Sequence, residues 1–322
     1  MRGKLVVVFG GSGFVGRHVV RALCKAGARV RVAMRRPHLG ADLRVCGDVG
    51  QVQLVQANVR DTPSVARALE GADAAVNLVG LLFEKGRQTF DDVQAQGAAN
   101  VAEAAKAAGV TAFVHMSAIG ADAASTSAYG LTKAKAEAAV RAVLPDAVIL
   151  RPSIIFGPED DFFNRFGDMA KMSPALPLIG GGKTRFQPVY VGDVAAAVVA
   201  GLSRPDAAGR TFELGGPRTY SFRELLEFIL RETARPRLLV NLPFPIAQAL
   251  GSAADAVFRF NPFAGPPLTG DQVVMLKSDN VVADSALTLA DLGVAPLETV
   301  EAITPTYLYR FRPYGQFQAK AA

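Results

Sequence analysis

The chain has 322 residues, of which 50% are hydrophobic, and it carries a formal net charge of +6 with a sequence pI near 9.4. This length suits a nucleotide-sized domain with a smaller lobe. The positive charge admits an anionic partner, but no lysine-arginine block, aromatic-basic alternation or zinc spacing is present, so nucleic acid is not predicted. The two cysteines and three histidines show no ligand spacing, so no metal site is predicted.

The first expected element is a buried strand at residues 4–9, which leads into the glycine-rich segment 8–16. Gly10, Gly13 and Gly16 recur at every third position, and an amphipathic helix pattern follows them. Glycines in this position allow a tight turn, let backbone N–H groups approach a pyrophosphate and let the helix pack closely on the strand. The pattern predicts a dinucleotide site. A glycine-rich turn in an unrelated α/β protein is the alternative.

A second strand is expected at residues 28–34, and Arg35 and Arg36 follow it. An acidic residue at this place would bind the ribose hydroxyl of NAD, whereas two guanidiniums pair with the 2′-phosphate of NADP. NADPH is therefore the predicted cofactor. A solvated basic loop is the alternative, because arginine is common on protein surfaces.

Four further strands are expected, at residues 52–57, 74–79, 112–116 and 147–150. Helical patterns separate them, and this alternation predicts an α/β fold of the Rossmann type, with a doubly wound parallel sheet. Ligands of such sheets lie at the carboxyl ends of the strands. Asn58 and Val59 are therefore expected at the adenine, and Leu78, Val79 and Gly80 under the middle of the cofactor.

Ser117 directly follows the expected strand 112–116, and Tyr129 and Lys133 come later in the sequence Tyr-Gly-Leu-Thr-Lys. Residues four apart share one face of a helix, so the phenol and the ammonium converge on one site. The ammonium favours the phenolate and binds the nicotinamide ribose, while the serine hydroxyl holds a substrate carbonyl and the tyrosine passes a proton. These three residues are the predicted catalytic set.

Together these motifs resemble a short-chain dehydrogenase/reductase of the extended or atypical kind, over nearly the whole chain. Residues 150–158 resemble the family segment whose backbone passes the nicotinamide, and residues 187–194 resemble the return into the nucleotide domain. The resemblance implies a nucleotide domain, a smaller C-terminal α/β lobe and an extended tail, at residues 1–157 with 186–204, 158–185 with 205–303, and 304–322. The residues expected at the cofactor are Gly10, Ser12, Gly13, Phe14, Val15, Gly16, Arg35, Arg36, Asn58, Val59, Leu78, Val79, Gly80, Ser117, Tyr129, Lys133, Pro152, Ile154 and Ile155.

A narrower resemblance comes from residues 266–273, 276–282 and 304–314, which look like the nucleotide-binding accessory subunit of respiratory complex I, the last of them like its bacterial form. This family resemblance implies an NADPH that is held tightly without turnover, and partner subunits at the junction of the peripheral and membrane arms. The catalytic set would then be inherited scaffolding. If the chain is complete, its first strand leaves no room for a leader, and the cytoplasmic face of the bacterial inner membrane is the expected location.

Two segments leave alternatives open. No apolar run reaches the ~20 residues of a spanning helix, but residues 242–263 are rich in apolar side chains and suit peripheral lipid contact or, better, a core or protein-contact helix. The tail interleaves aromatic residues with arginines, which suits either a partner interface or packing on its own domain.

The main functional alternative is a working NADP-dependent reductase, dehydrogenase or epimerase that acts on a sugar nucleotide or a small carbonyl compound. That alternative requires Ser117, Tyr129 and Lys133, whereas the accessory-subunit interpretation only tolerates them. Because fold does not fix function, the sequence alone leaves both open.

Overall fold

The computed structural model describes residues 1–258, 266 and 268–317, and the chain divides into two compact units. Unit 1 comprises Met1–Pro152, Val191–Leu214 and Ala283–Ala295. Unit 2 comprises Ser153–Tyr190, Gly215–Val282 and Pro296–Ala322.

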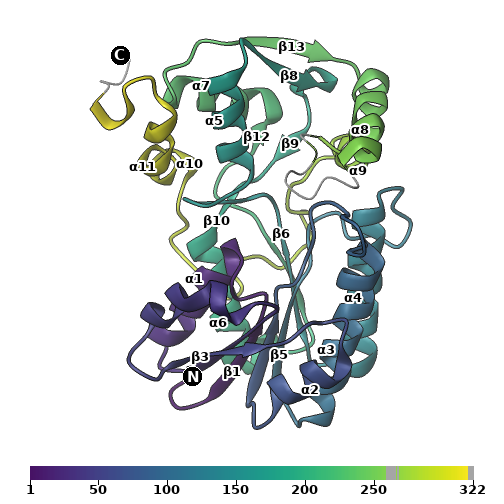
Figure 1. Ribbon diagram of the computed structural model, residues 1–322, viewed down its shortest axis with the longest axis vertical. Coiled ribbons are helices and arrows are strands. Elements are labelled where there is room, and N and C mark those ends of the chain that lie inside the picture. The colour runs from purple at the N-terminus through teal and green to yellow at the C-terminus, as the bar shows by residue number, and fades with distance from the viewer. Residues whose placement is uncertain (259–265, 267, 318–322) are drawn as a thin grey trace. The chain divides into compact units, whose positions relative to one another are not determined.

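Unit 1 is built on a seven-stranded sheet with the order β11-β6-β5-β4-β1-β2-β3, in which all neighbouring strands are parallel (Figure 1). Its strands are β1 (Leu5–Phe9), β2 (Arg29–Met34), β3 (Val52–Gln56), β4 (Ala74–Asn77), β5 (Ala112–Met116), β6 (Val148–Pro152) and β11 (Thr211–Leu214). The chain leaves β1 toward β2 on one side and later returns to β4 on the other, so the strand order reverses between β1 and β4. The predicted doubly wound sheet is confirmed, and this reversal is where such folds bind ligands.

Helices cover both faces of this sheet, as right-handed crossovers between parallel strands require. Helices α1 and α6 pack together on one face, and α2, α3 and α4 cover the other (Figure 1). The helices of unit 1 are α1 (Phe14–Lys25), α2 (Thr62–Leu69), α3 (Gln96–Ala107), α4 (Ala128–Val143) and α6 (Val191–Ser203).

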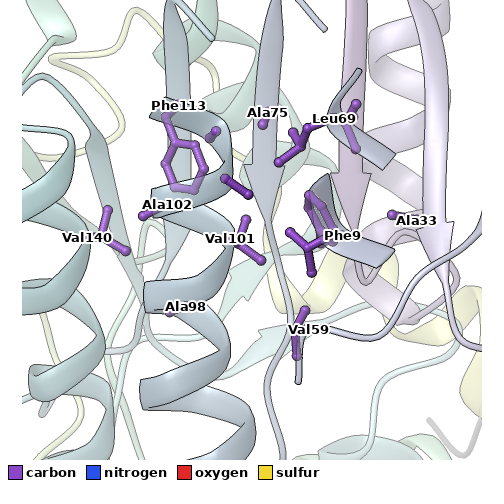
Figure 2. Close-up of a cluster of buried hydrophobic side chains, with 14 of the residues drawn as sticks. Phe9, Ala33, Val59, Leu69, Ala75, Ala98, Val101, Ala102, Phe113 and Val140 are labelled. Carbon is purple, nitrogen blue, oxygen red and sulfur yellow. The ribbon is translucent and has the colours of Figure 1, made fainter. Parts of the chain in front are cut away.

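A buried apolar cluster joins the sheet to α2, α3 and α4 (Figure 2). Phe9 of β1 and Phe113 of β5 pack against Val101 of α3, with Leu69 and Val140 from the flanking helices. Alanines fill much of the α3 face, which lets that helix approach the sheet closely. This burial fixes the helices whose ends carry the site residues.

The described residues of unit 2 form three small two-stranded sheets and several helices. Its strands pair as β7 (Ile155–Phe156) with β10 (Val189–Tyr190), β9 (Arg185–Phe186) with β12 (Tyr220–Ser221), and β8 (Ala175–Ile179) with β13 (Leu238–Leu242). Its described helices are α5 (Phe162–Met172), α7 (Phe222–Glu232), α8 (Phe244–Phe258), α9 (Gly270–Met275), α10 (Val300–Ile303) and α11 (Pro305–Leu308). A second apolar cluster packs α5 against α7 and includes residues from the tail.

Four segments lie in a different unit from the one predicted from the sequence. Residues 153–157 and 186–190 belong to unit 2 rather than to the nucleotide domain, and residues 205–214 and 283–295 belong to unit 1. Strand β11 pairs with β6, and the Glu213 N–H donates to the Leu287 carbonyl at 2.8 Å. The last two segments are therefore parts of unit 1 rather than of the smaller lobe. The pairing joins residues far apart in sequence, so no local pattern marks it.

The apolar segment 242–263 forms α8 up to Phe258, and residues 259–263 lie outside the described part of the chain. Helix α8 buries Ala247 and Gly251, while Ile246, Leu250 and Val257 are exposed. Among the helices of residues 1–258, 266 and 268–317, none has both the length and the apolar character needed to cross a bilayer.

The tail is anchored in unit 2. Tyr307, Leu308 and Phe311 are buried in its apolar cluster, whereas Tyr314 and Phe317 are exposed. Both alternatives for the tail therefore keep support: its first part packs on its own unit, and its later aromatic side chains stay accessible. Residues 318–322 of the expected tail lie outside the described residues.

Candidate functional site

The glycine-rich turn follows β1, and its backbone lies close to the backbone at Leu78 and to the start of α1. Gly10 has φ +79°, and a Cβ there would lie 3.1 Å from the Leu78 carbonyl carbon. A Cβ on Gly16 would lie only 2.3 Å from the Gly10 carbonyl oxygen. Gly13 is the N-cap of α1, so no capping side chain covers the N–H groups of the first turn, which includes Phe14 and Val15. This arrangement presents backbone donors and the positive end of a helix dipole to an anion.

The end of β4 faces this turn and is held by a buried polar pair. The Asn77 side-chain oxygen accepts the Val79 N–H at 3.1 Å, and its amide nitrogen donates to Nδ1 of His115 at 3.3 Å. Burial, with a smaller contribution from the charge of Lys133, lowers the pKa of His115 to about 3. The imidazole is therefore neutral at pH 7. Through its hydrogen bond with Asn77, which in turn accepts the Val79 N–H, it helps to fix the backbone that leads to Gly80. Sequence reasoning assigned His115 no chemistry.

At the end of β3, Asn58 and Val59 face different surroundings. The Asn58 side-chain oxygen accepts the Arg60 N–H at 3.2 Å in a local turn. Val59 is buried, and a Cβ on Gly97 of α3 would lie 2.8 Å from its Cγ2, so its side chain packs into the core shown in Figure 2. Because the Val59 side chain lies in the core, only its backbone remains available to cover the adenine ring as the sequence predicts.

Ser117, Tyr129 and Lys133 come together at the end of β5. The Lys133 ammonium donates to the Met116 carbonyl at 3.1 Å and lies 5.7 Å from the centroid of the Tyr129 ring. Burial lowers the pKa of Lys133 to about 8, against the opposing charge of Glu137. The Ser117 hydroxyl is buried and, within the described part of the chain, has no hydrogen-bond partner. Such an orphaned group suits a polar ligand.

An ion pair fixes the helix that carries Tyr129 and Lys133. The Arg151 guanidinium of β6 donates to both carboxylate oxygens of Glu137 on α4, at 2.9 and 2.7 Å. It also lies 3.7 Å from the carboxylate of Glu213 on β11. Because the pairing with Glu137 is bidentate, it restricts rotation of α4 about its axis and so helps to aim the predicted catalytic side chains.

Gln94 is a site residue that sequence reasoning missed. It lies on a π-helical turn (Asp91–Ala95) before α3, and its amide nitrogen donates to the Thr132 hydroxyl at 3.3 Å. Its amide oxygen is buried and has no partner among the described residues. A Cβ on Gly80 would lie 3.4 Å from both this oxygen and the Lys133 ammonium. No residue pattern announces a π-helical turn, so the sequence held no signal for it.

Arg35 and Arg36 follow β2 as expected, and both side chains are exposed. Arg35 donates to the side-chain oxygen of Gln88. Of the remaining predicted residues, Ser12 lies in the glycine turn and Pro152 ends β6 in unit 1, while Ile154 and Ile155 belong to unit 2. There the Ile154 carbonyl accepts the Val189 N–H at 3.0 Å.

Comparisons with known proteins identify a matching family model, similar sequences and a shared fold. Residues 6–215 match the model of the NAD dependent epimerase/dehydratase family. The chain is 37% identical to NADH dehydrogenase (ubiquinone) 1 alpha subcomplex subunit 9, mitochondrial, of Arabidopsis thaliana, over 97% of the chain and 79% of that protein. It is 34% identical to the ceramide reductase of Caulobacter vibrioides, over 78% of each protein.

A solved structure shares the fold. The dTDP-glucose 4,6-dehydratase of Streptomyces venezuelae, solved with NAD and TYD bound, superposes with a TM-score of 0.73 at 20% identity, over 95% of this chain and 96% of that one. At this identity the likeness bears on the fold alone.

Proposed function

Because the chain belongs to the NAD dependent epimerase/dehydratase family and also to the family of NADH dehydrogenase (ubiquinone) 1 alpha subcomplex subunit 9, we propose that it is a nucleotide-binding accessory subunit of respiratory complex I. The observation that carries the proposal is the extent of the second likeness. It spans 97% of the chain and so continues beyond residue 215, where the family model ends. The proposal places the protein at the cytoplasmic face of a bacterial inner membrane, beside subunits at the junction of the two arms.

The residues of unit 1 fit a nicotinamide dinucleotide. The glycine turn lacks room for side chains where a pyrophosphate would approach, and Gly80 leaves space beside two polar side chains. In this role the α1 N–H groups hold the pyrophosphate, and Tyr129 and Lys133 hold the nicotinamide ribose. Such a cofactor supplies hydride chemistry when bound. In an accessory subunit it acts as a ligand that stabilises the native state, because it binds only the folded unit.

The assembly proposal is tested on native membranes. Membranes are solubilised gently, complexes are separated on a native gel stained for NADH dehydrogenase activity, and the chains in the active band are identified. We expect this chain in the band at about one copy per complex, as a stoichiometric subunit requires. Recovery of the chain only from the soluble fraction would overturn the proposal.

We propose NADPH rather than NADH as the nucleotide, and Arg35 and Arg36 as the discriminating residues. Replacing both by alanine is expected to weaken NADPH binding about tenfold or more, because charge-assisted bonds to the 2′-phosphate are lost, and to change NADH binding little. Calorimetric titration of each nucleotide checks this. Arg29→Ala is the matched control, since Arg29 is exposed at the opposite end of the same strand. Equal losses for both nucleotides would show that the pair does not contact the 2′-phosphate.

A working reductase is the second candidate function, and the convergence of Ser117, Tyr129 and Lys133 favours it, as does the likeness to a ceramide reductase. In that role the serine hydroxyl would hold a carbonyl oxygen and the tyrosine phenol would give it a proton. The buried ammonium would lower the cost of the resulting phenolate.

Tyr129→Phe separates the two functions. If the chain is an accessory subunit, the variant is expected to assemble normally and to sustain NADH:quinone activity within about twofold of the wild type, because no proton passes through the phenol. If it is a reductase, NADPH oxidation with its carbonyl substrate falls by about 10²–10⁴-fold. The two rates are measured on membranes from a strain that carries the variant. A large loss of carbonyl-dependent NADPH oxidation would contradict the accessory role.

A further inference from the structure

Three guanidiniums lie at the carboxyl ends of β2 and β3. Arg35 and Arg36 follow β2, and Arg60 follows the adjacent strand β3. Among the residues that the structure describes, none of the three forms an ion pair. Other arginines of unit 1 do, as Arg17 does with Asp42 and Arg151 with Glu137. A cluster of unpaired cations beside the proposed nucleotide site is suited to an anion.

A short hairpin meets this cluster. Lys85 and Gln88 pair as an antiparallel bridge, with backbone hydrogen bonds of 3.0 and 2.9 Å in the two directions, and Gly86 makes the turn at φ +55°. The Arg35 guanidinium donates to the Gln88 side-chain oxygen, and the Arg60 guanidinium donates to the Arg87 carbonyl at 2.7 Å. Because residues 87 and 88 are neighbours, these contacts bring Arg35 and Arg60 to the same tip of the hairpin.

Both acceptors on the hairpin are neutral oxygens. A guanidinium bonds more strongly to an anionic oxygen than to an amide or carbonyl oxygen. A phosphate at this position would therefore form stronger hydrogen bonds than the two neutral oxygens do. Because the guanidiniums are exposed, they would lose little solvation when the phosphate binds. The hydrogen bond between Arg35 and Gln88 is thus of a kind that an anionic ligand can displace.

We propose that Arg60 and the hairpin at residues 85–88 complete the 2′-phosphate site, and that the Gln88 amide engages Arg35 until a 2′-phosphate takes its place. This inference rests on the proposed binding of NADPH by Arg35 and Arg36. It adds Arg60 and the hairpin to the 2′-phosphate site. The hairpin then determines selectivity between phosphorylated and unphosphorylated nucleotides. It touches no reacting atom.

The test measures binding of 2′,5′-ADP and 5′-ADP to the full chain by calorimetry, because the two probes differ only in the 2′-phosphate. Gln88→Glu places a carboxylate against Arg35, where it pairs with the guanidinium and repels phosphate. We expect this variant to bind 2′,5′-ADP about tenfold more weakly and 5′-ADP unchanged. Arg60→Ala is expected to give a similar selective loss, and Gln88→Ala to leave the preference for 2′,5′-ADP intact.

Gln53→Glu is the matched control, because Gln53 accepts from Arg31 at 3.0 Å in the same type of pair, away from the carboxyl ends of the strands. It should leave both affinities unchanged. If the wild type shows no preference for 2′,5′-ADP, the assignment of NADPH itself fails. If the wild type shows the preference but Gln88→Glu and Arg60→Ala keep it, only the role of Arg60 and the hairpin is overturned.

Discussion

Gly16→Ala is expected to abolish nucleotide binding and to lower the unfolding temperature of unit 1 by roughly 6–12 °C, which corresponds to about 3 kcal/mol in a domain of this size. The added Cβ would lie 2.3 Å from the Gly10 carbonyl oxygen and 2.5 Å from the Gly11 Cα. These are backbone atoms, so no side-chain rotation relieves the clash, and the turn between β1 and α1 must open. Calorimetric scanning and titration with NADPH measure the two effects.

Gly13→Ala is the matched control in the same turn. A Cβ there would come no nearer than 3.4 Å to another atom, the Gly10 carbonyl oxygen, which is an ordinary contact. We therefore expect the unfolding temperature to change by only about 1–2 °C, in line with a surface substitution of ~0.5 kcal/mol. If Gly16→Ala is as well tolerated as Gly13→Ala, the close approach of α1 to the turn is not what holds the site.

Phe311→Ala is expected to destabilise unit 2 by about 3–5 kcal/mol, because it removes a buried ring from a packed cluster. Phe311 is 5% exposed, and a Cβ on Gly167 of α5 would lie 2.7 Å from its ring, so the ring fills the space that this glycine leaves. Phe317→Ala, at a side chain that is 87% exposed, should change stability by less than ~0.5 kcal/mol. Thermal unfolding of both variants gives the comparison.

The neighbouring contacts of Phe311 explain why this part of the tail belongs to the fold. Its carbonyl accepts from the Arg235 guanidinium at 2.6 Å, and the Tyr307 hydroxyl donates to the Asp160 carboxylate at 2.5 Å. Burial raises the pKa of Asp160 to about 6, although its hydrogen bond from Tyr307 acts in the opposite direction. Removal of residues 304–322 would therefore damage unit 2 itself. If Phe311→Ala and Phe317→Ala unfold at the same temperature, this anchoring is refuted.

The exposed end of the tail remains the proposed partner contact. Tyr314 and Phe317 are accessible, and aromatic side chains are frequent anchors of interfaces. Removing residues 313–322 spares the anchor at Tyr307 and Phe311, so it separates docking from folding better than removing the whole tail.

The sequence predicted the parts of the fold that local patterns determine. Strand-helix alternation was enough to place Gly10, Arg35, Gly80 and Ser117 at one edge of a sheet, because parallel strands end at the same edge. The helical spacing of Tyr129 and Lys133 was enough to bring them to one face. Each of these predictions needs only the order of elements along the chain.

The remaining features depend on contacts between distant residues. His115 of β5 contacts Asn77 of the adjacent strand β4. Gln94 lies at the site because it is part of a π-helical turn. Neither residue type is unusual at its position, so no pattern marked it. The tail is similar, since tyrosine and arginine serve equally in interfaces and in packing against the same chain, and only the burial of Tyr307 reveals the anchor.

The most direct test of the central claim is the nucleotide content of purified complex I before and after turnover. The complex is incubated with NADH and a quinone, quenched, and its bound nucleotide is extracted and quantified by chromatography. We predict about one NADPH per complex, lost when this chain is absent and still reduced after many turnovers of the NADH:quinone reaction. A complex that contains the chain but no NADPH, or one whose NADPH is oxidised during turnover, would contradict a nucleotide held without turnover.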